Sequence, residues 1–161
     1  MSFRIGHGVD THRLEPGRSL TLGGVQIPFE RGLAGHSDAD VVCHALANAL
    51  LGAIGEGDIG EHFPDTNQRY KGMSSLHLLN IVVKKVGDKG YRIQNADLTL
   101  MAEHPKIGPF KDDMRTNLSQ ALGIGRSAIN VKATTGEKLG FVGRGEGMTA
   151  EAVVLLEAAA K

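Results

Sequence analysis

Residues 3–14 read FRIGHGVDTHRL, an alternating stretch that contains an aspartate and a histidine two positions apart. Successive side chains of a β-strand point to opposite faces of the sheet. The pattern therefore predicts a strand on which Asp10 and His12 point the same way. One face of this strand would carry Arg4, Gly6, Gly8, Asp10 and His12, and the other Phe3, Ile5, His7 and Val9.

The composition limits the classes of function that the chain can have. Its 161 residues fit one domain, 1–161, and its 18 basic and 18 acidic side chains balance, which argues against general binding to nucleic acids. The sequence has neither an apolar run of about 20 residues nor a targeting signal, so we expect a cytoplasmic protein with no membrane partner. The single cysteine, Cys43, cannot form an intrachain disulfide and is expected to be buried in a helix.

The clearest helix lies in residues 36–52, HSDADVVCHALANALLG. Ser37 is a natural N-cap, Asp40 would be the third helical residue, and Gly52 can end the helix. A period of 3.6 residues predicts a buried stripe on one side and a polar flank on the other. The stripe is Val42, Leu46, Ala49 and Leu50, and the flank is Asp40, His44, Ala47 and Asn48.

The remaining elements alternate between strands and helices. A Gly-Gly pair within residues 19–29 predicts a hairpin, and residues 55–72 are expected to form a long functional loop. Helices are expected over 74–89 and from Pro109 to Gly123, and strands over 93–101 and 129–135. Residues 149–161 suit either a helix or a buried strand. This order predicts a two-layer sandwich of helices and strands.

Asp10, His12 and His44 form a candidate metal site. Catalytic zinc typically takes three protein ligands and keeps a fourth position open. Two ligands would come from one strand face and His44 from the facing helix, and Asp40, one turn before His44, could accept its second imidazole N–H. The competing interpretation is a surface hydrogen bond between Asp10 and His12.

Two further segments could bind anions. His36 and Ser37 precede the predicted helix, where backbone N–H groups favour a phosphate, although Ser37 could be a cap alone. Residues 132–147, KATTGEKLGFVGRGEG, combine cations, hydroxyls and glycines with Glu137 but lack the order of a Walker A loop. This segment could equally be a turn-rich surface loop. Asp58 and Asp65 could bind ribose hydroxyls or be solvated.

Four stretches together resemble a known family. They are RIGHGVDTHRL (4–14), LGGVQIPFERGLAGHSDADVVCHAL (22–46), GDIGEHFPDT (57–66) and INVKATTGEKLGFVGRGEG (129–147). Their joint order and spacing are similar to those of the 2-C-methyl-D-erythritol 2,4-cyclodiphosphate synthases of the non-mevalonate isoprenoid pathway. The resemblance covers nearly the whole chain.

The resemblance implies an α+β fold, a two-layer sandwich with a mixed sheet on one side and helices on the other. It implies a homotrimer whose sheets face the threefold axis, with active sites between subunits, and it makes the last segment a strand. It implies a Zn²⁺ site at Asp10, His12 and His44, a second cation, Mg²⁺ or Mn²⁺, at Glu137, and catalytic roles for His36 and Thr135.

The substrate implied is 4-diphosphocytidyl-2-C-methyl-D-erythritol 2-phosphate, with cytidine against residues 102–106 and Asp58 at the ribose. The sequence departs from the family at Asn48, Gly136 and Glu103-His104, so side-chain contacts there are open. The implied contacts are Asp10, His12, His36, Ser37, Asp58, Ile59, Gly60, Phe63, Pro64, Asp65, Thr66, Asn67, Ala102, Glu103, His104, Pro105, Lys106, Ile107, Gly108, Thr134, Thr135, Gly136, Glu137, Phe141 and Arg144.

Two alternatives stay open at this point. The same three ligands could serve a zinc hydrolase in which bound water fills the fourth position. The chain could also be a trimeric protein that binds an isoprenoid phosphate in an axial cavity, with Phe141, Arg144 and Glu146 contributing to that site.

Overall fold

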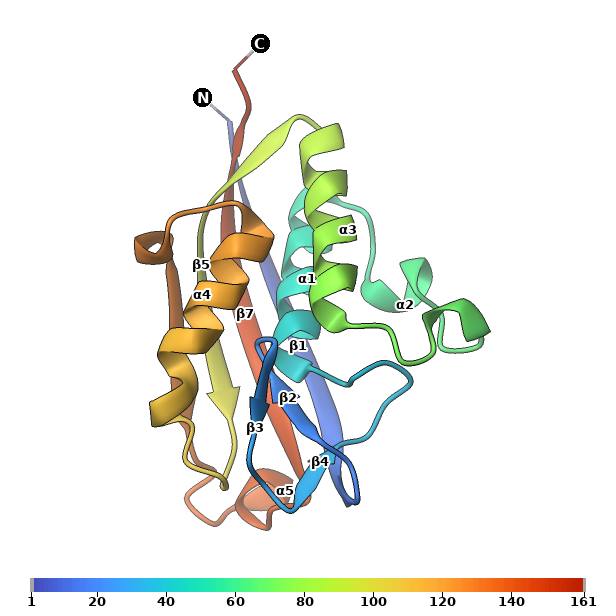
Figure 1. The fold of residues 1–161 in the computed structure, drawn as a ribbon. Helices are drawn as coiled ribbons and strands as arrows, with labels where there is room; N and C mark the ends of the chain where they lie inside the picture. Colours follow the sequence, from blue (N-terminus) through green and yellow to red (C-terminus); the bar gives the residue numbers. More distant parts are fainter. Residues whose placement is uncertain (1, 161) are drawn as a thin grey trace.

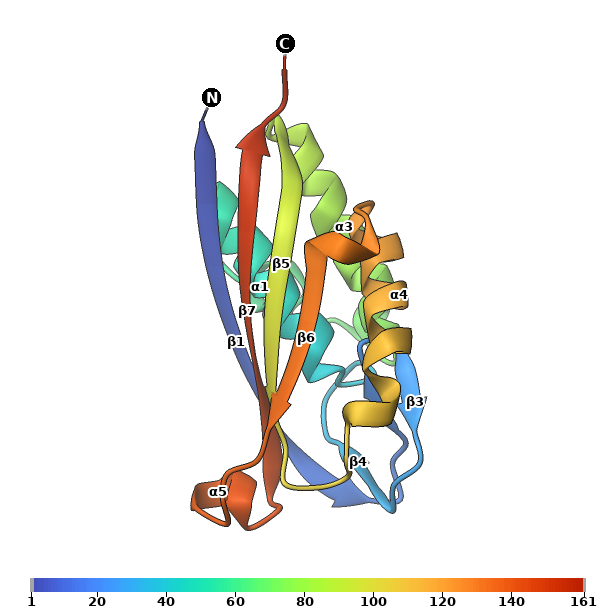
Figure 2. The ribbon, with the colours of Figure 1, turned by 90° about the vertical axis from the view of Figure 1, so that its left-hand side faces the viewer.

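The computed structural model describes residues 2–160 and has two layers (Figure 1). The main sheet has the strand order β4-β1-β7-β5-β6, in which only β5 and β6 run parallel. All three long helices cover one face of this sheet, as a second view shows (Figure 2). The predicted α+β fold with a mixed sheet and a helical layer is therefore confirmed.

The sheet and the helical layer contain most of the regular structure. The sheet strands are β1 (Phe3–Pro16), β4 (Arg31–Leu33), β5 (Tyr91–Met101), β6 (Ile129–Thr134) and β7 (Gly147–Ala158), and β2 (Leu20–Leu22) and β3 (Val25–Ile27) form the predicted hairpin. The long helices are α1 (Val41–Ile54), α3 (Ser75–Asp88) and α4 (Lys111–Leu122). The short ones are α2 (Ile59–His62), α5 (Gly140–Gly143) and 3-10 turns at Gln68–Tyr70, Gly108–Phe110 and Arg126–Ala128.

Helix α1 lies directly on β1 because two glycines leave room for it. A Cβ atom on Gly6 would lie 1.8 Å from the carbonyl oxygen of Ala49, and one on Gly8 would lie 2.0 Å from that of Ala45. Both distances are far below van der Waals contact, so any side chain there would push the helix away. The predicted alternation is confirmed, since the glycines face the helix while Phe3 and Ile5 are exposed on the other face.

The start and end of α1 differ from the prediction. Asp40, not Ser37, is the N-cap, and its carboxylate accepts hydrogen bonds from the amides of Gly23 (2.9 Å), Gly24 (2.7 Å) and Cys43 (3.2 Å). The helix runs through Gly52 and ends at a left-handed Gly55. The predicted polar flank is also wrong in part, because Asp40 and Ala47 are fully buried. Tertiary contacts with the hairpin and the sheet outweigh the local signals here.

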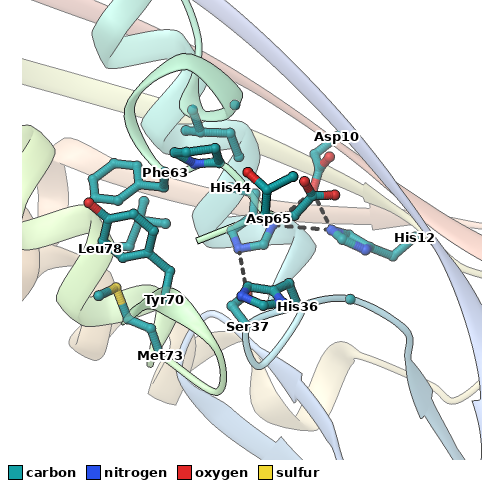
Figure 3. A pocket seen from close by; sticks show the side chains of 15 residues that line it. Asp10, His12, His36, Ser37, His44, Phe63, Asp65, Tyr70, Met73 and Leu78 are labelled. Atoms are coloured by element: carbon teal, nitrogen blue, oxygen red, sulfur yellow. Dashed lines mark hydrogen bonds and ion pairs between the residues drawn. The ribbon is translucent and has the colours of Figure 1, made fainter. Parts of the chain in front are cut away.

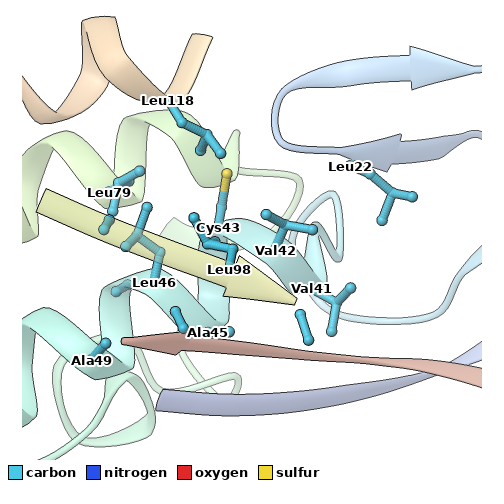
Figure 4. Close-up of a cluster of buried hydrophobic side chains, with 14 of the residues drawn as sticks. Leu22, Val41, Val42, Cys43, Ala45, Leu46, Ala49, Leu79, Leu98 and Leu118 are labelled. Carbon is cyan, nitrogen blue, oxygen red and sulfur yellow. The ribbon is translucent and has the colours of Figure 1, made fainter. Parts of the chain in front are cut away.

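The core lies between the sheet and the three long helices. Leucines and valines of α1, α3 and α4 meet those of β5, and Cys43 is buried among them as predicted (Figure 4). Burial raises the pKa of the Cys43 thiol well above its usual value, with a further contribution from Asp40. Cys43 is therefore an inert packing residue.

The ambiguous last segment is strand β7, which pairs antiparallel with β1 and β5. One row of the sheet contains Asp10, Ala150, Leu100 and Ala133 on four successive strands. The ends of β1, β5 and β6 that follow this row therefore lie at one edge of the sheet. Within residues 2–160, no helix is long and apolar enough to cross a membrane.

Candidate functional site

Asp10, His12 and His44 converge on one point, as the sequence predicts (Figure 3). The Oδ2 atom of Asp10 lies 2.7 Å from Nε2 of His12 and 3.1 Å from Nδ1 of His44. The two imidazole nitrogens are 3.1 Å apart. Strand β1 supplies two side chains from its helix-facing side, and the first turn of α1 supplies the third.

The outer nitrogen of each imidazole is held by the protein. Nδ1 of His12 donates to the carbonyl oxygen of Ala34 at 2.6 Å. Nε2 of His44 lies 2.9 Å from Oγ of Ser75 and 3.2 Å from Oγ of Ser37. The predicted hydrogen bond from His44 to Asp40 is wrong, because the hairpin and the N-terminus of α1 occupy the Asp40 carboxylate.

Burial and charge act against each other at this cluster. Burial alone would raise the pKa of Asp10, but the imidazoles of His12 and His44 at its carboxylate outweigh burial and lower the pKa to about 2. Burial alone would lower the pKa of His12, but its hydrogen bond to Asp10 and the charge of that carboxylate raise it. The cluster thus stabilises positive charge beside a carboxylate.

The donor set of the cluster fits a metal ion. With their outer nitrogens held by other groups, both histidines can offer their inner nitrogens to a cation, and Asp10 adds a carboxylate oxygen there. A metal ion would replace the protons that the inner atoms share. All three ligand atoms lie within 4.8 Å of one another, and two nitrogens with one oxygen are a donor set that zinc accepts.

The cluster forms part of the wall of a cavity of about 480 Å³. An aromatic and aliphatic wall lies across from the three ligands, and in it the rings of Phe63 and Tyr70 meet edge to face at 5.3 Å (Figure 3). Sequence reasoning missed Tyr70, Met73 and Leu78 in this wall. The predicted residues that line the cavity are Asp10, His12, His36, Ser37, His44, Ile59, Gly60, Phe63, Pro64, Asp65 and Thr66.

A second cavity, of about 470 Å³, lies where β5 and β6 end. Its shape depends on Glu103, whose carboxylate accepts hydrogen bonds from the amides of Gly136 (2.9 Å) and Lys138 (3.2 Å). These bonds hold the loop in which Glu137 has a φ of 51°. The predicted residues that line this cavity are Ala102, Glu103, Pro105, Lys106, Ile107, Gly108, Thr134, Thr135 and Glu137.

The two cavities lie apart in one chain. Their strands, β1 and β6, are separated by three strand spacings along the sheet, about 14 Å. The structure therefore does not bring His36 and Thr135 together within the chain. His36 lines the metal cavity and bonds the carbonyl of Asn67 at 3.2 Å, whereas Thr135 lines the second cavity.

Several predicted contacts line neither cavity. The carboxylate of Asp58 and the amide oxygen of Asn67 cap the short helical turns that follow them. His104 and Gly136 lie in the loops of the second cavity, and Phe141 and Arg144 lie in or next to α5, where Arg144 pairs with Glu146 at 2.8 Å. Asn48, one of the departures, accepts from the amide of Ile59 at 2.9 Å and so anchors α2 to α1.

Comparisons with known proteins agree on one family. The model described as the YgbB family matches residues 3–157. A curated protein of Syntrophotalea carbinolica named 2-C-methyl-D-erythritol 2,4-cyclodiphosphate synthase is 58% identical over 158 residues, which are 98% of this chain and 96% of that protein.

Solved structures give the same result. A 2C-methyl-D-erythritol-2,4-cyclodiphosphate synthase in a CDP-bound form superposes with a TM-score of 0.89 at 40% identity, covering 96% of this chain and 100% of that one. The bifunctional IspDF of Campylobacter jejuni superposes with a TM-score of 0.94 at 44% identity. That match covers 98% of this chain and 42% of the bifunctional chain.

Proposed function

Since the chain belongs to the YgbB family, we propose that it converts 4-diphosphocytidyl-2-C-methyl-D-erythritol 2-phosphate to 2-C-methyl-D-erythritol 2,4-cyclodiphosphate and CMP. The observation that carries the proposal is the convergence of three metal-ligating atoms in the wall of a cavity large enough for a phosphorylated small molecule. The enzyme is a phosphorus-oxygen lyase of isoprenoid biosynthesis. Its reaction joins two phosphates of one substrate and expels the nucleotide.

The chain needs no general base for this reaction, because the attacking phosphate oxygen is already anionic at neutral pH. The demand is to relieve repulsion between two phosphates and to support charge on the leaving CMP. Asp10, His12 and His44 would hold Zn²⁺, which supplies Lewis acidity toward a phosphate oxygen when bound. The cavity would also hold the flexible substrate bent, with the reacting atoms in line.

His36 is the proposed hydrogen-bond donor of the metal cavity. Its Nε2 atom bonds the carbonyl oxygen of Asn67. His36 would therefore leave Asn67 when Nε2 donates to a substrate phosphate. The apolar wall at Phe63 suits the carbon skeleton of the erythritol, and the nearby Ser37 and Asp65 suit its polar groups.

The second cavity would bind the cytidine end of a substrate held by a neighbouring subunit. The backbone of residues 102–106 would contact the base, and Thr135 would donate to a phosphate. Glu137 would hold Mg²⁺ or Mn²⁺ together with substrate phosphates, because magnesium is usually bound by one or two carboxylates plus phosphate oxygens. Asp58 keeps one carboxylate oxygen outside its capping bond and would reach the ribose.

A homotrimer accounts for the division of the site between two cavities. The sheet face away from the helices carries four apolar side chains that are 45–73% exposed, and such a patch is typical of an interface. These residues are Phe3, Ile5, Val9 and Val153. Burying this face around a threefold axis would pair the metal cavity of one subunit with the second cavity of the next. A central cavity for an isoprenoid phosphate remains a prediction.

A CMP-release assay on two substrates tests the proposal. The full substrate should release CMP and give a cyclic diphosphate by ³¹P NMR, whereas the analogue without the 2-phosphate should release none. CMP release from both, with a linear phosphate as product, would instead identify a zinc hydrolase with water as nucleophile.

A further inference from the structure

The metal ligand His44 rests on a buried chain of polar groups that the reaction does not use. Its Nε2 atom lies 2.9 Å from the hydroxyl of Ser75, which is fully buried at the first turn of α3. The same hydroxyl is hydrogen-bonded to Oδ1 of Asp38, and the amide of Ser75 donates to Oδ2 of Asp38 at 3.0 Å. Asp38, Ser75 and His44 thus form a continuous chain that leads to the metal cluster.

The direction of each proton in this chain follows from the groups themselves. An ionised carboxylate only accepts, so the Ser75 hydroxyl donates to Asp38. The serine oxygen then offers a lone pair to His44, whose Nε2 must carry the proton. A neutral imidazole has one N–H, and Nδ1 is therefore left with its lone pair directed at Asp10 and His12. The serine and the aspartate select the tautomer that can bind a metal.

Ser37 is a weaker partner of the same nitrogen. Its hydroxyl lies farther from Nε2, at 3.2 Å, and also accepts from the amide of Ala39. Ser75 is the nearer contact and the fully buried one, so it governs the tautomer.

We propose that Ser75 and Asp38 are positioning residues that fix the Nε2–H tautomer of His44 and thereby set its affinity for zinc. The proposal rests on the proposed zinc site and deepens it. Partners of metal-ligating histidines of this kind typically alter metal affinity or activity 10–100-fold when mutated. Here the partner comes from α3, 31 residues away along the chain.

Asp38 also has a structural role, from which the proposed one must be separated. Its amide donates to the carbonyl of Met73 at 3.2 Å, and its Oδ1 accepts from the amide of Asp40 at 3.1 Å. These bonds tie residues 36–40 to residues 72–75. A purely structural effect would lower stability without changing which nitrogen of His44 carries the proton.

Zinc affinity, measured by competition with a chromophoric chelator, is the first readout. Ser75→Ala should bind Zn²⁺ roughly 10–100-fold more weakly than the unmodified protein. Two serine-to-alanine controls should bind it unchanged. Ser74 is adjacent but makes no capping hydrogen bond, and Ser119 is a buried serine of α4 whose hydroxyl donates to the carbonyl of Thr116 in its own helix.

The tautomer, measured by ¹⁵N NMR of the imidazoles in metal-free protein, is the second readout. The unmodified protein should show His44 protonated on Nε2, and Ser75→Ala should gain the Nδ1–H form. Asp38→Asn is nearly isosteric and removes the carboxylate charge that attracts the Ser75 hydroxyl proton, so the Nδ1–H form of His44 should again gain population. If Ser75→Ala does not fold, Asp38→Asn still tests whether these two residues set the tautomer of His44.

The outcomes separate this inference from the proposed function. Unchanged zinc affinity and an unchanged tautomer in the folded variants would overturn the inference while leaving the zinc site intact. A different result is that the unmodified protein fails to bind zinc while the Nε2–H tautomer of His44 still depends on Ser75. That result would overturn the proposed function and the role of the Asp38–Ser75–His44 hydrogen bonds in zinc binding.

Discussion

The two cavities differ in how completely one chain builds them. The metal cavity has three candidate metal ligands on a strand and a helix, and hydrogen bonds to Ala34 and Ser75 fix the orientation of the two histidines. The second cavity is made mostly of loop residues, and its Glu137 and Thr135 are exposed. The difference indicates that the proposed metal ligands are preorganised within one chain, whereas the proposed catalytic arrangement would be completed only by the second cavity of a neighbouring subunit.

Removing one metal ligand should have the largest effect. His44→Ala should lose zinc and lower turnover at least about 100-fold, because the charge on the phosphates is no longer stabilised. The variant should stay folded, since its side chain lies at the edge of the core. Metal analysis and CMP release check this, with His77→Ala as a control that lines neither cavity. Retained zinc and retained rate would show that His44 is no ligand.

Mixing two inactive variants tests whether the cavities belong to one site. His44→Ala disables the metal cavity and Thr135→Ala the second one. Subunits exchanged at random in a trimer should recover about one quarter of the sites, because each intact site needs one good half from each of two neighbours. Each variant, taken through the same subunit-exchange procedure alone, serves as a control. Mixed trimers, verified by mass, that regain no activity would contradict a site shared between subunits.

Glu137→Gln should have a smaller and more selective effect. The loss of one carboxylate charge weakens the binding of a hard cation. The concentration of Mg²⁺ or Mn²⁺ needed for half-maximal rate should therefore rise, roughly 10-fold if about 1.4 kcal/mol of binding free energy is lost. The zinc content should not change, because Glu137 lies in the other cavity. An unaltered divalent-ion titration would remove Glu137 from its assigned role.

The smallest effect concerns the pH dependence of the metal-free protein. Asp10 has its pKa lowered from 3.8 to about 2, so its contribution to stability is present above about pH 4 and is lost as the pH falls toward 2. His12 has a raised pKa, so its contribution is present below pH 6.5 and is lost as the pH rises through the folded value.

Thermal melts of chelator-treated protein between pH 2 and 8 would measure the loss of stability at low pH and the loss at high pH. Asp10→Asn should make the melting temperature less dependent on pH at both the acidic and the basic end, because it removes the acidic group and the partner of His12. A profile identical to that of the unmodified protein would mean that the pair does not couple to folding.

Much of the metal cavity could be predicted because it depends on local periodicity. Alternation along β1 places Asp10 and His12 on one face, and the helical signal after residue 40 brings His44 opposite them. The partner of His44 could not be predicted in the same way, because Ser75 arrives from another helix through tertiary packing. Spacing along α1 favours Asp40, which the hairpin amides bind instead.

Other features escaped prediction for related reasons. The last segment has residues typical of both helix and strand, and only pairing with β1 and β5 decides that it is β7. Gly52 resembles a helix end but lies within α1, because contacts with the sheet keep the helix intact. Tyr70 ends a short 3-10 turn and Met73 lies in the loop that follows, a stretch without periodicity, so nothing local indicates that they line the cavity.

X-ray diffraction with anomalous data collected on both sides of the zinc edge tests the central claim most directly. Crystals grown with Zn²⁺ should show one strong peak per chain, about 2.0–2.2 Å from Oδ2 of Asp10, Nε2 of His12 and Nδ1 of His44. The absence of a peak at these three atoms, or zinc bound at another place in the chain, would contradict the account.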